Sequence, residues 1–210
     1  GRISMFSAQQ RAGRAARLKD GYCFRLWHTM DELSMPAQIE PEILSSDLFN
    51  ETLTLLSLGI SDPKNFSWLD QPQKSFDEVL LQLKKWLLID ESKRITPYGR
   101  LVQSCPLDLE RSVLFIALAQ AGFQREASAL LAFIETTAFD KLTHAVDLTR
   151  LPMNDMARKI EQQLLQMKVT ATNDHVNLNF KSQLIKTFFE KFPNKIAKKR
   201  DKNQAVSSLG

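Results

Sequence analysis

Three arginines near the start of the sequence recur at every third position and could bind phosphate. Arg11, Arg14 and Arg17 follow Gln10 in the segment Gln-Arg-Ala-Gly-Arg-Ala-Ala-Arg. A guanidinium group stays charged in proteins, and its forked donors match pairs of phosphate oxygens. On a helix this spacing directs the three groups to neighbouring but fanned positions. The cluster therefore suits stabilisation of a nucleotide γ-phosphate during transfer, and the alternative is a solvated basic helix.

The order of these residues resembles motif VI of superfamily 2 helicases, on the DEAH-box side. Two neighbouring stretches are similar as well: residues 3–8 resemble the strand and turn before the motif, and residues 21–27 resemble the strand after it. Ala16 is a departure, because the family usually has Gly there. Since Ala is the better helix former, we expect a tighter helix with the same phosphate contacts.

The resemblance implies specific roles for the motif. Gln10 would help to position the attacking water, and Arg14 and Arg17 would act as arginine fingers on ATP, with Arg11 as a further nucleotide contact. ATP and Mg²⁺ would be bound mainly by another RecA-like domain of the same polypeptide. No phosphate loop of the Gly-x-x-x-x-Gly-Lys-Ser/Thr kind occurs in the 210 residues, so we expect this chain alone to be inactive.

Composition and charge limit the remaining possibilities. The hydrophobic content of 43% is that of a protein with buried cores, and no run is apolar enough to span a bilayer. The net charge of +4 comes from the two ends, because residues 31–180 carry fourteen basic and twenty-one acidic side chains. An acidic middle disfavours a surface-wide nucleic-acid platform, so any such contact is a patch. Two cysteines, Cys23 and Cys105, are interpreted as reduced packing residues of a cytoplasmic protein.

The sequence predicts a mainly α fold in four parts. Residues 1–40 are interpreted as the end of a RecA-like α/β domain, interrupted at Gly1, with a strand on each side of the motif helix. Residues 41–106 resemble a winged-helix module, residues 107–192 predict a helical bundle similar to the family's ratchet domain, and residues 193–210 form a basic tail.

In residues 41–106, short stretches of sequence predict where helices begin and end. Apolar spacing predicts a helix from Ser46 that stops at Gly59, and a second helix from Phe76 to about Asp90. Thr96 is a plausible N-cap with Pro97 at the first helical position. In the family that this region resembles, the module is mainly a structural hub, so we do not expect it to read duplex DNA.

Four apolar stripes predict the bundle. Their members are Leu109, Val113, Leu114, Ile116 and Ala117; Ala127, Leu130, Leu131 and Ile134; Met156, Ile160, Gln163, Leu164 and Met167; and Leu184, Ile185, Phe188, Phe189 and Phe192. The phenylalanines of the fourth stripe are interpreted as core rather than as base-stacking groups, because they recur at helical spacing. Trp68 and Trp86 are interpreted as packing residues of the winged-helix module.

The basic tail and the residues just before it indicate which group of helicases the chain resembles most. Residues 192–200 are similar to a Phe-Pro-Asp-Arg-Ile-Ala-Arg-Arg-Arg signature of HrpB-type bacterial helicases. Within it, Lys198, Lys199 and Arg200 are weak candidates for contact with a nucleic-acid backbone, and the alternative is a solvated tail. The three histidines (His28, His144 and His175) are scattered, so no metal site is predicted.

The resemblance implies an ATP-dependent helicase that translocates on single-stranded RNA or DNA, of which this chain is a C-terminal fragment, with no membrane partner. Two alternatives remain open. One is a winged-helix binding protein without ATPase activity, which would bind duplex DNA through residues 45–105. The other is a helicase-derived interaction domain that has lost its catalytic half.

Overall fold

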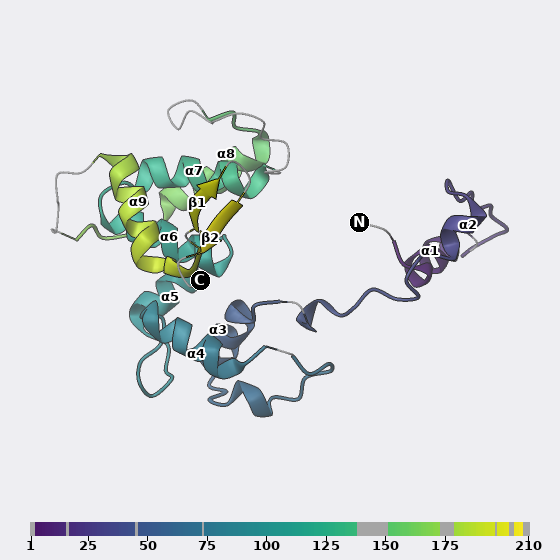
Figure 1. The fold of residues 1–210 in the computed structure, drawn as a ribbon, viewed down its shortest axis with the longest axis horizontal. Coiled ribbons are helices and arrows are strands. Elements are labelled where there is room, and N and C mark those ends of the chain that lie inside the picture. Colours follow the sequence, from purple (N-terminus) through teal and green to yellow (C-terminus); the bar gives the residue numbers. More distant parts are fainter. Residues whose placement is uncertain are drawn as a thin grey trace. The chain divides into compact units, whose positions relative to one another are not determined.

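The fold was analysed in a computed structural model of the chain, which is mainly helical as predicted (Figure 1). It describes residues 3–15, 17–44, 46–72, 74–137, 151–172, 179–195, 197–201 and 204–207. The α-helices are α1 (Met5–Ala12), α2 (Thr29–Glu32), α3 (Phe49–Ser57), α4 (Phe76–Lys85), α5 (Pro97–Gln103), α6 (Leu109–Gln120), α7 (Gln124–Thr136), α8 (Asp155–Gln166) and α9 (Phe180–Lys191). Short 3₁₀ turns are η1 (Glu42–Leu44), η2 (Pro63–Asn65) and η4 (Pro193–Lys195), and the strands are β1 (Ala197–Asp201) and β2 (Gln204–Ser207).

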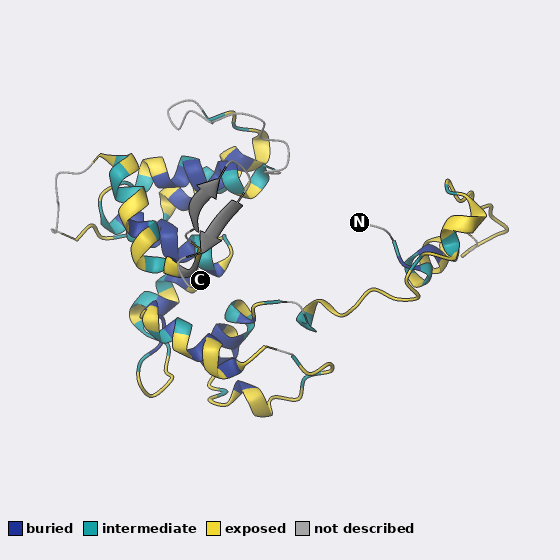
Figure 2. Cartoon of the chain, in the orientation of Figure 1, coloured by how far each residue is buried: buried dark blue, intermediate teal, exposed yellow. Residues whose placement is uncertain are grey.

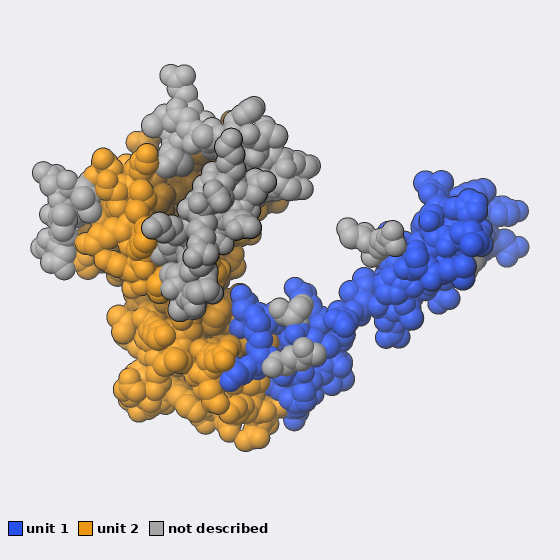
Figure 3. Space-filling view, in the orientation of Figure 1, with its two compact units in different colours: residues 1–47, 67–75 blue, residues 48–66, 76–210 orange. Residues whose placement is uncertain are grey.

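The chain divides into two compact units, coloured separately in Figure 3. Unit 1 comprises residues 1–47 and 67–75, and unit 2 comprises residues 48–66 and 76–210. Among the described residues of unit 1, only Ser4 and Ala8 are buried, whereas buried residues recur along the helices of unit 2 (Figure 2). The hydrophobic core of the described chain therefore lies in unit 2.

The predicted strand after the motif is absent from the described residues of unit 1. Residues 20–26 run without strand pairing, and Tyr22, Phe24 and Leu26 are 84–94% exposed. Cys23 in the same stretch is also exposed, contrary to its interpretation as a packing residue. A strand needs a neighbour to accept and donate its backbone hydrogen bonds, and none is present beside this segment in the part of the chain that the structure describes.

Unit 2 begins with three short helices around an apolar centre. Leu48, Leu53, Leu83, Leu88 and Val102 are almost completely buried. The stop at Gly59 is confirmed, because α3 ends at Ser57 and Gly59 has a φ of +87°. The predicted cap of α5 is confirmed too: the Thr96 hydroxyl accepts a 2.9 Å hydrogen bond from the Gly99 amide, and Pro97 is in the first turn.

Helix α4 is shorter than predicted. It ends at Lys85, and Leu87, which was expected to extend its apolar stripe, has a φ of +62° and is 64% exposed. The left-handed residue turns the chain so that Leu88 and Ile89 become buried instead. Ile89 then pairs with Ile95 in a single antiparallel bridge across a tight turn. Periodicity does not detect this exit, because Leu87 keeps the helical spacing that the backbone abandons.

Helices α6 to α9 lie together as the predicted bundle (Figure 1). Its best-buried side chains belong to α6 and α7, including Phe115, Ile116, Leu118 and Leu131. The Gln124 side-chain amide donates to the carbonyl oxygens of Leu164 (3.0 Å) and Met167 (2.9 Å), so α7 caps the carboxyl end of α8.

The third and fourth apolar stripes are only partly correct. In α8, Ala157 and Leu164 are buried while Met156 is 59% exposed. Phe192, which follows α9 directly, is buried, but Phe189 within α9 is 57% exposed, so not all phenylalanines of the fourth stripe are core residues. A helix at the edge of a bundle buries a narrower face than its apolar stripe suggests. The predicted irregular segment 138–150 lies outside the described residues.

Trp86 joins the first helices of unit 2 to its last helix. Its ring lies 5.0 Å from that of Phe49 and 5.6 Å from that of Phe192, centroid to centroid. Its indole Nε1 donates a 2.9 Å hydrogen bond to the carbonyl oxygen of Lys191. The packing of Trp86 therefore extends beyond the module to which the residue was assigned from the sequence.

Part of the expected basic tail is a hairpin rather than an extended end. β1 pairs with β2 in antiparallel register, with Ala197 opposite Ser207 and an irregularity between Lys199 and Asp201. This ribbon accounts for all the strands in the part of the chain that the structure describes. In that same part, no helix has the length and apolar character needed to cross a membrane.

Candidate functional site

Helix α1 starts where the sequence supplies a cap. The buried Ser4 hydroxyl accepts a 3.1 Å hydrogen bond from the Ser7 amide. The first amides of the helix are satisfied by the connector of unit 1, because Met5 donates to the Pro36 carbonyl (3.0 Å) and Phe6 to that of Ala37 (3.1 Å). These contacts fix the start of the helix that carries the arginine motif.

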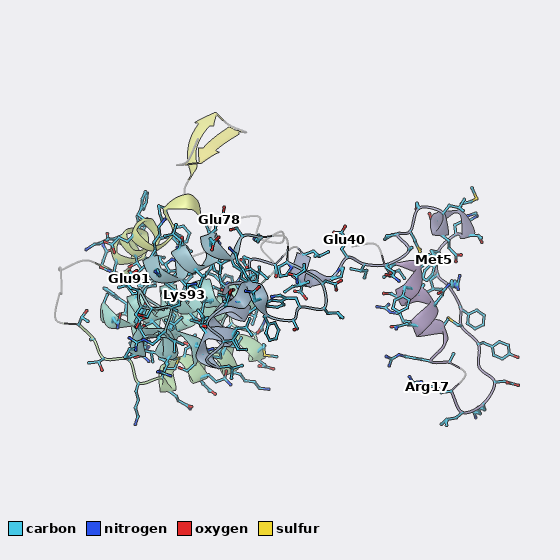
Figure 4. The ribbon with its side chains drawn as sticks, turned by 90° about the horizontal axis from the view of Figure 1, so that it is seen from below. Met5, Arg17, Glu40, Glu78, Glu91 and Lys93 are labelled. Carbon is cyan, nitrogen blue, oxygen red and sulfur yellow. The ribbon has the colours of Figure 1, made fainter. Side chains whose placement is uncertain are left out.

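The motif is only partly helical, which corrects our expectation of a helix through all three arginines. Gln10 and Arg11 belong to α1, but the helix ends at Ala12, and Arg14 lies in the turn that follows. Arg17 lies in the loop beyond (Figure 4), and Ala16 is outside the described residues. The C-cap residue is Gly13, which has a right-handed φ of −64°, so the physical reason is the low helix propensity of glycine and not a left-handed cap.

The loop after the motif folds back onto it. A Cβ atom at Gly21 would lie 1.9 Å from the carbonyl oxygen of Ala15, so any side chain at this position would collide with the backbone. Glycine is therefore required for the close approach of these two segments.

Gln10, Arg11, Arg14 and Arg17 are all exposed. Among the described residues, none of the three arginines forms an ion pair or a side-chain hydrogen bond with the protein. Arg25 differs, because its Nη1 atom lies 2.6 Å from Glu32 Oε1. The motif guanidinium groups are therefore available to an external anion, and they fit a phosphate group.

Glu32 anchors the segment that follows the motif. Its Oε1 atom accepts from Arg25 and, at 3.1 Å, from the indole nitrogen of Trp27. The Arg25 hydrogen bond, followed by that of Trp27, lowers the pKa of the Glu32 carboxyl. His28 caps the short helix α2, with its Nδ1 atom accepting from the Met30 amide at 3.2 Å. The histidine has a structural role here.

The weak candidates in the basic tail lie in strand β1. Lys198, Lys199 and Arg200 are within its bounds, Ala197–Asp201, while Lys202 lies outside the described residues. This ribbon was not predicted from the sequence, because β1 reads Ala-Lys-Lys-Arg-Asp and has no alternation of apolar and polar residues. Its register fixes where these residues occur along the strand.

A second cluster of cations was missed by sequence reasoning. Lys93, Arg94 and Arg100 line a cavity of about 270 Å³ in unit 2, together with residues from the end of α3. The three cations lie close together in the sequence, but the opposite wall comes from residues 56–61, more than thirty positions earlier, so local spacing could not reveal the cavity. Within the residues that the structure describes, no group of three His, Cys, Asp or Glu side chains is arranged to hold a metal ion.

Comparisons with known proteins place this geometry in context. No protein-family model matches the chain. It is 36% identical over 121 residues to the probable ATP-dependent RNA helicase DHR2 of Saccharomyces cerevisiae. The match covers 57% of this chain and 16% of the yeast protein.

Two crystal structures of HrpB from Escherichia coli are similar in fold. One is described as a DExH-box NTPase, with a TM-score of 0.61 over 96% of this chain and 24% of that chain. The other, described as a DEAH/RHA helicase, has a TM-score of 0.67 over 95% of this chain and 25% of that chain. Both are 26% identical in sequence. The chain thus spans about a quarter of the HrpB structures and less of DHR2. The resemblance predicted from the sequence is therefore confirmed: the chain matches part of a DEAH-box helicase of the HrpB type.

Proposed function

We propose that this chain is the C-terminal part of an ATP-dependent DEAH-box helicase and that Arg14 and Arg17 are its arginine fingers. The observation that supports this most directly is the cluster after α1, whose guanidinium groups are exposed and form no ion pair in the described part of the chain. Unpaired arginines need no internal contact to be broken before they bind phosphate. The start of the helix, in contrast, is fixed by hydrogen bonds to Pro36 and Ala37.

The chemistry required of these residues is electrostatic. In phosphoryl transfer, negative charge spreads over the oxygens of the γ-phosphoryl group, and a guanidinium group placed against them stabilises the transition state. Arg14 and Arg17 would supply that charge, Arg11 would bind the nucleotide beside them, and the Gln10 amide would orient the attacking water. Mg²⁺ would be held by residues of another RecA-like domain in the same polypeptide and would neutralise charge on the phosphates.

Unit 2 would act on the strand. The region 41–106 would be a winged-helix module that serves as a hub, and the helical bundle would act as a ratchet that prevents a single strand of RNA or DNA from slipping back. The similarity to DHR2, which is named as an RNA helicase, favours RNA as the strand. The cellular compartment that we propose is the cytoplasm. The chain alone would not hydrolyse ATP, because it lacks a phosphate loop.

The test is ATP turnover by the full-length polypeptide, with and without single-stranded RNA, at one salt concentration. Arg14→Ala and Arg17→Ala should each lower turnover by about 10³-fold or more, as expected for an arginine finger. Arg125→Ala is the matched control, because it removes an exposed arginine of α7 that forms no ion pair in the described residues. Turnover by both motif variants at the wild-type rate would show that the motif is a solvated basic segment.

A further inference from the structure

The cation-lined cavity of unit 2 carries the further inference. It lies between the end of α3 and the tight turn that joins Ile89 to Ile95, and its volume is about 270 Å³. Leu56 and Ile95 form its apolar wall. Its remaining side chains are the cationic groups of Lys93, Arg94 and Arg100 and three serine hydroxyls. This "basic cavity" contains donors on several sides and no acidic residue in its described lining.

The cations of the basic cavity are largely unneutralised. Neither Lys93 nor Arg100 forms an ion pair in the described residues, and both side chains are exposed. Arg94 is paired through Nε, 3.0 Å from Asp90 Oδ2, which leaves its terminal nitrogens free of that contact. The nearby Glu91, which is labelled with Lys93 in Figure 4, forms an ion pair with Lys84, whose Nζ atom lies 2.8 Å from Glu91 Oε2. The local charge is therefore positive, although the middle of the sequence is acidic overall.

The turn that presents these cations is held in one conformation. The Asp90 carboxylate accepts hydrogen bonds from the amides of Ser92 (2.8 Å) and Arg94 (2.9 Å), and its backbone amide donates to the Arg94 carbonyl at 2.8 Å. Lys93 has a φ of +59°, and a 3.0 Å hydrogen bond from its amide to the Asp90 carbonyl holds the backbone in this conformation. A conformation fixed before binding reduces the entropy that is lost when an anion binds.

Hydroxyl groups add further donors. In the described part of the chain, the hydroxyls of Ser61 and Ser92 form no hydrogen bond with the protein, whereas Ser57 donates to the Thr54 carbonyl at 2.7 Å. A tetrahedral phosphate oxygen can accept from a hydroxyl, an ammonium group and a guanidinium group together. The composition of the lining therefore matches a phosphate group better than a neutral ligand.

We propose that the basic cavity binds a backbone phosphate of a single-stranded nucleic acid, with Lys93, Arg94 and Arg100 as its cationic ligands. The choice of a nucleic-acid strand rests on the proposed function. The contact is independent of sequence, because phosphate carries no base information. It would make the region between α3 and α5 a second anchor for the strand, in addition to its expected role as a hub.

The experiment is fluorescence anisotropy of a labelled single-stranded RNA with the whole chain, measured over a series of salt concentrations. Lys93→Gln and Arg100→Gln should each weaken binding by about threefold to tenfold. The slope of log K against log salt should become shallower by about 0.7 for each phosphate that is no longer neutralised. Lys85→Gln is the matched control, because it removes an exposed lysine that is not part of the cavity lining. Unchanged melting temperatures establish that the variants are folded.

Equal affinity of wild type and both cavity variants would overturn the proposal, as would an equal loss in Lys85→Gln. Poly-glutamate that competes as strongly as unlabelled RNA would also overturn it, because the site would then be a general anion attractor. Failure here is distinguishable from failure of the proposed function. The cavity variants are judged by RNA affinity of this chain without ATP, and the arginine-finger variants are judged by ATP turnover of the full-length polypeptide, which is measured in the absence as well as in the presence of RNA.

Discussion

The two units differ in which side chains they bury and in which apolar side chains they leave exposed. Unit 2 encloses Phe115, Ile116 and Leu118 within its helices, with no exposed fraction. Among its described residues, unit 1 buries only Ser4 and Ala8, and large apolar side chains such as Tyr22, Phe24 and Leu26 are exposed to water. The arginine motif, which we propose binds phosphate, belongs to the unit with few buried residues in its described part. A site of this kind is positioned by hydrogen bonds and a close glycine contact rather than by side-chain packing.

From this contrast we expect the stability of the chain to depend on unit 2 and the proposed ATPase role of the arginines to depend on unit 1. Removing a motif arginine from unit 1 should change activity without changing folding, because exposed side chains without partners add little to stability. Removing a core residue from unit 2 should do the reverse. The following substitutions test that separation.

The largest effect on stability is expected in the bundle. Phe115→Ala removes a ring that is completely buried in α6 and should destabilise unit 2 by about 3–5 kcal/mol. Phe24→Ala in unit 1 removes a ring that is 84% exposed and should change stability by about 0.5 kcal/mol or less. Chemical denaturation followed by circular dichroism measures both. Equal destabilisation by the two variants would contradict the prediction that the stability of the chain depends mainly on unit 2.

A smaller effect is expected from pH. Burial raises the pKa of Tyr98 to about 12, above its ordinary value of about 10. The folded state therefore holds the phenol proton after the unfolded state has lost it. The free energy of unfolding is therefore unaffected by ionisation of Tyr98 below pH 10. It falls by about 1–3 kcal/mol in total as pH rises from about 10 to 12.

Chemical denaturation at about pH 9 and about pH 11.5 measures the loss of unfolding free energy between the two pH values. This loss should be smaller in Tyr98→Phe than in wild type. The matched variant Tyr22→Phe alters an 88% exposed ring of unit 1 and should keep the wild-type dependence. If Tyr98→Phe loses as much stability between the two pH values as wild type does, then the buried phenol is not responsible.

The smallest effect concerns the two helix caps. Thr96→Ala removes the hydroxyl that accepts from Gly99 and should destabilise unit 2 by about 1 kcal/mol. Ser4→Ala removes the corresponding cap of α1 in unit 1 and should leave the melting temperature of unit 2 unchanged. Thermal melts of the two variants compare them directly, and a shift in the melting of unit 2 caused by Ser4→Ala would show that the units are energetically coupled.

Local signals predicted much of the fold. Gly59 ended α3 and Thr96 capped α5 as expected, because such ends depend on the conformation of one or two residues. Predictions that depended on distant partners were less accurate. Residues 21–27 resemble a family strand in sequence, but they have no neighbouring strand in the described residues. Phe189 has the spacing of a core residue on a helix whose outer face remains exposed.

The candidate site shows the same division. The order of residues from Gln10 to Arg17 was sufficient to indicate the helicase resemblance that the comparisons confirm, whereas the phosphate chemistry of these residues stays a prediction. It did not indicate that the helix ends at Ala12, nor that Gly21 returns against Ala15. The basic cavity had no signal in the sequence, because the folding of the chain brings Ser61 and Arg100 to one cavity.

The indole of Trp86 has a consequence for how the protein is made. Its acceptor, the Lys191 carbonyl, and its ring partner Phe192 are synthesised more than one hundred residues later. At about 5–20 residues per second, a nascent chain waits roughly 5–20 s for them. During that interval Trp86 can pack against Phe49 but not against Phe192. Closure of unit 2 therefore comes late in translation, and a ribosome that stalls before α9 would leave an incomplete apolar surface for chaperones to bind.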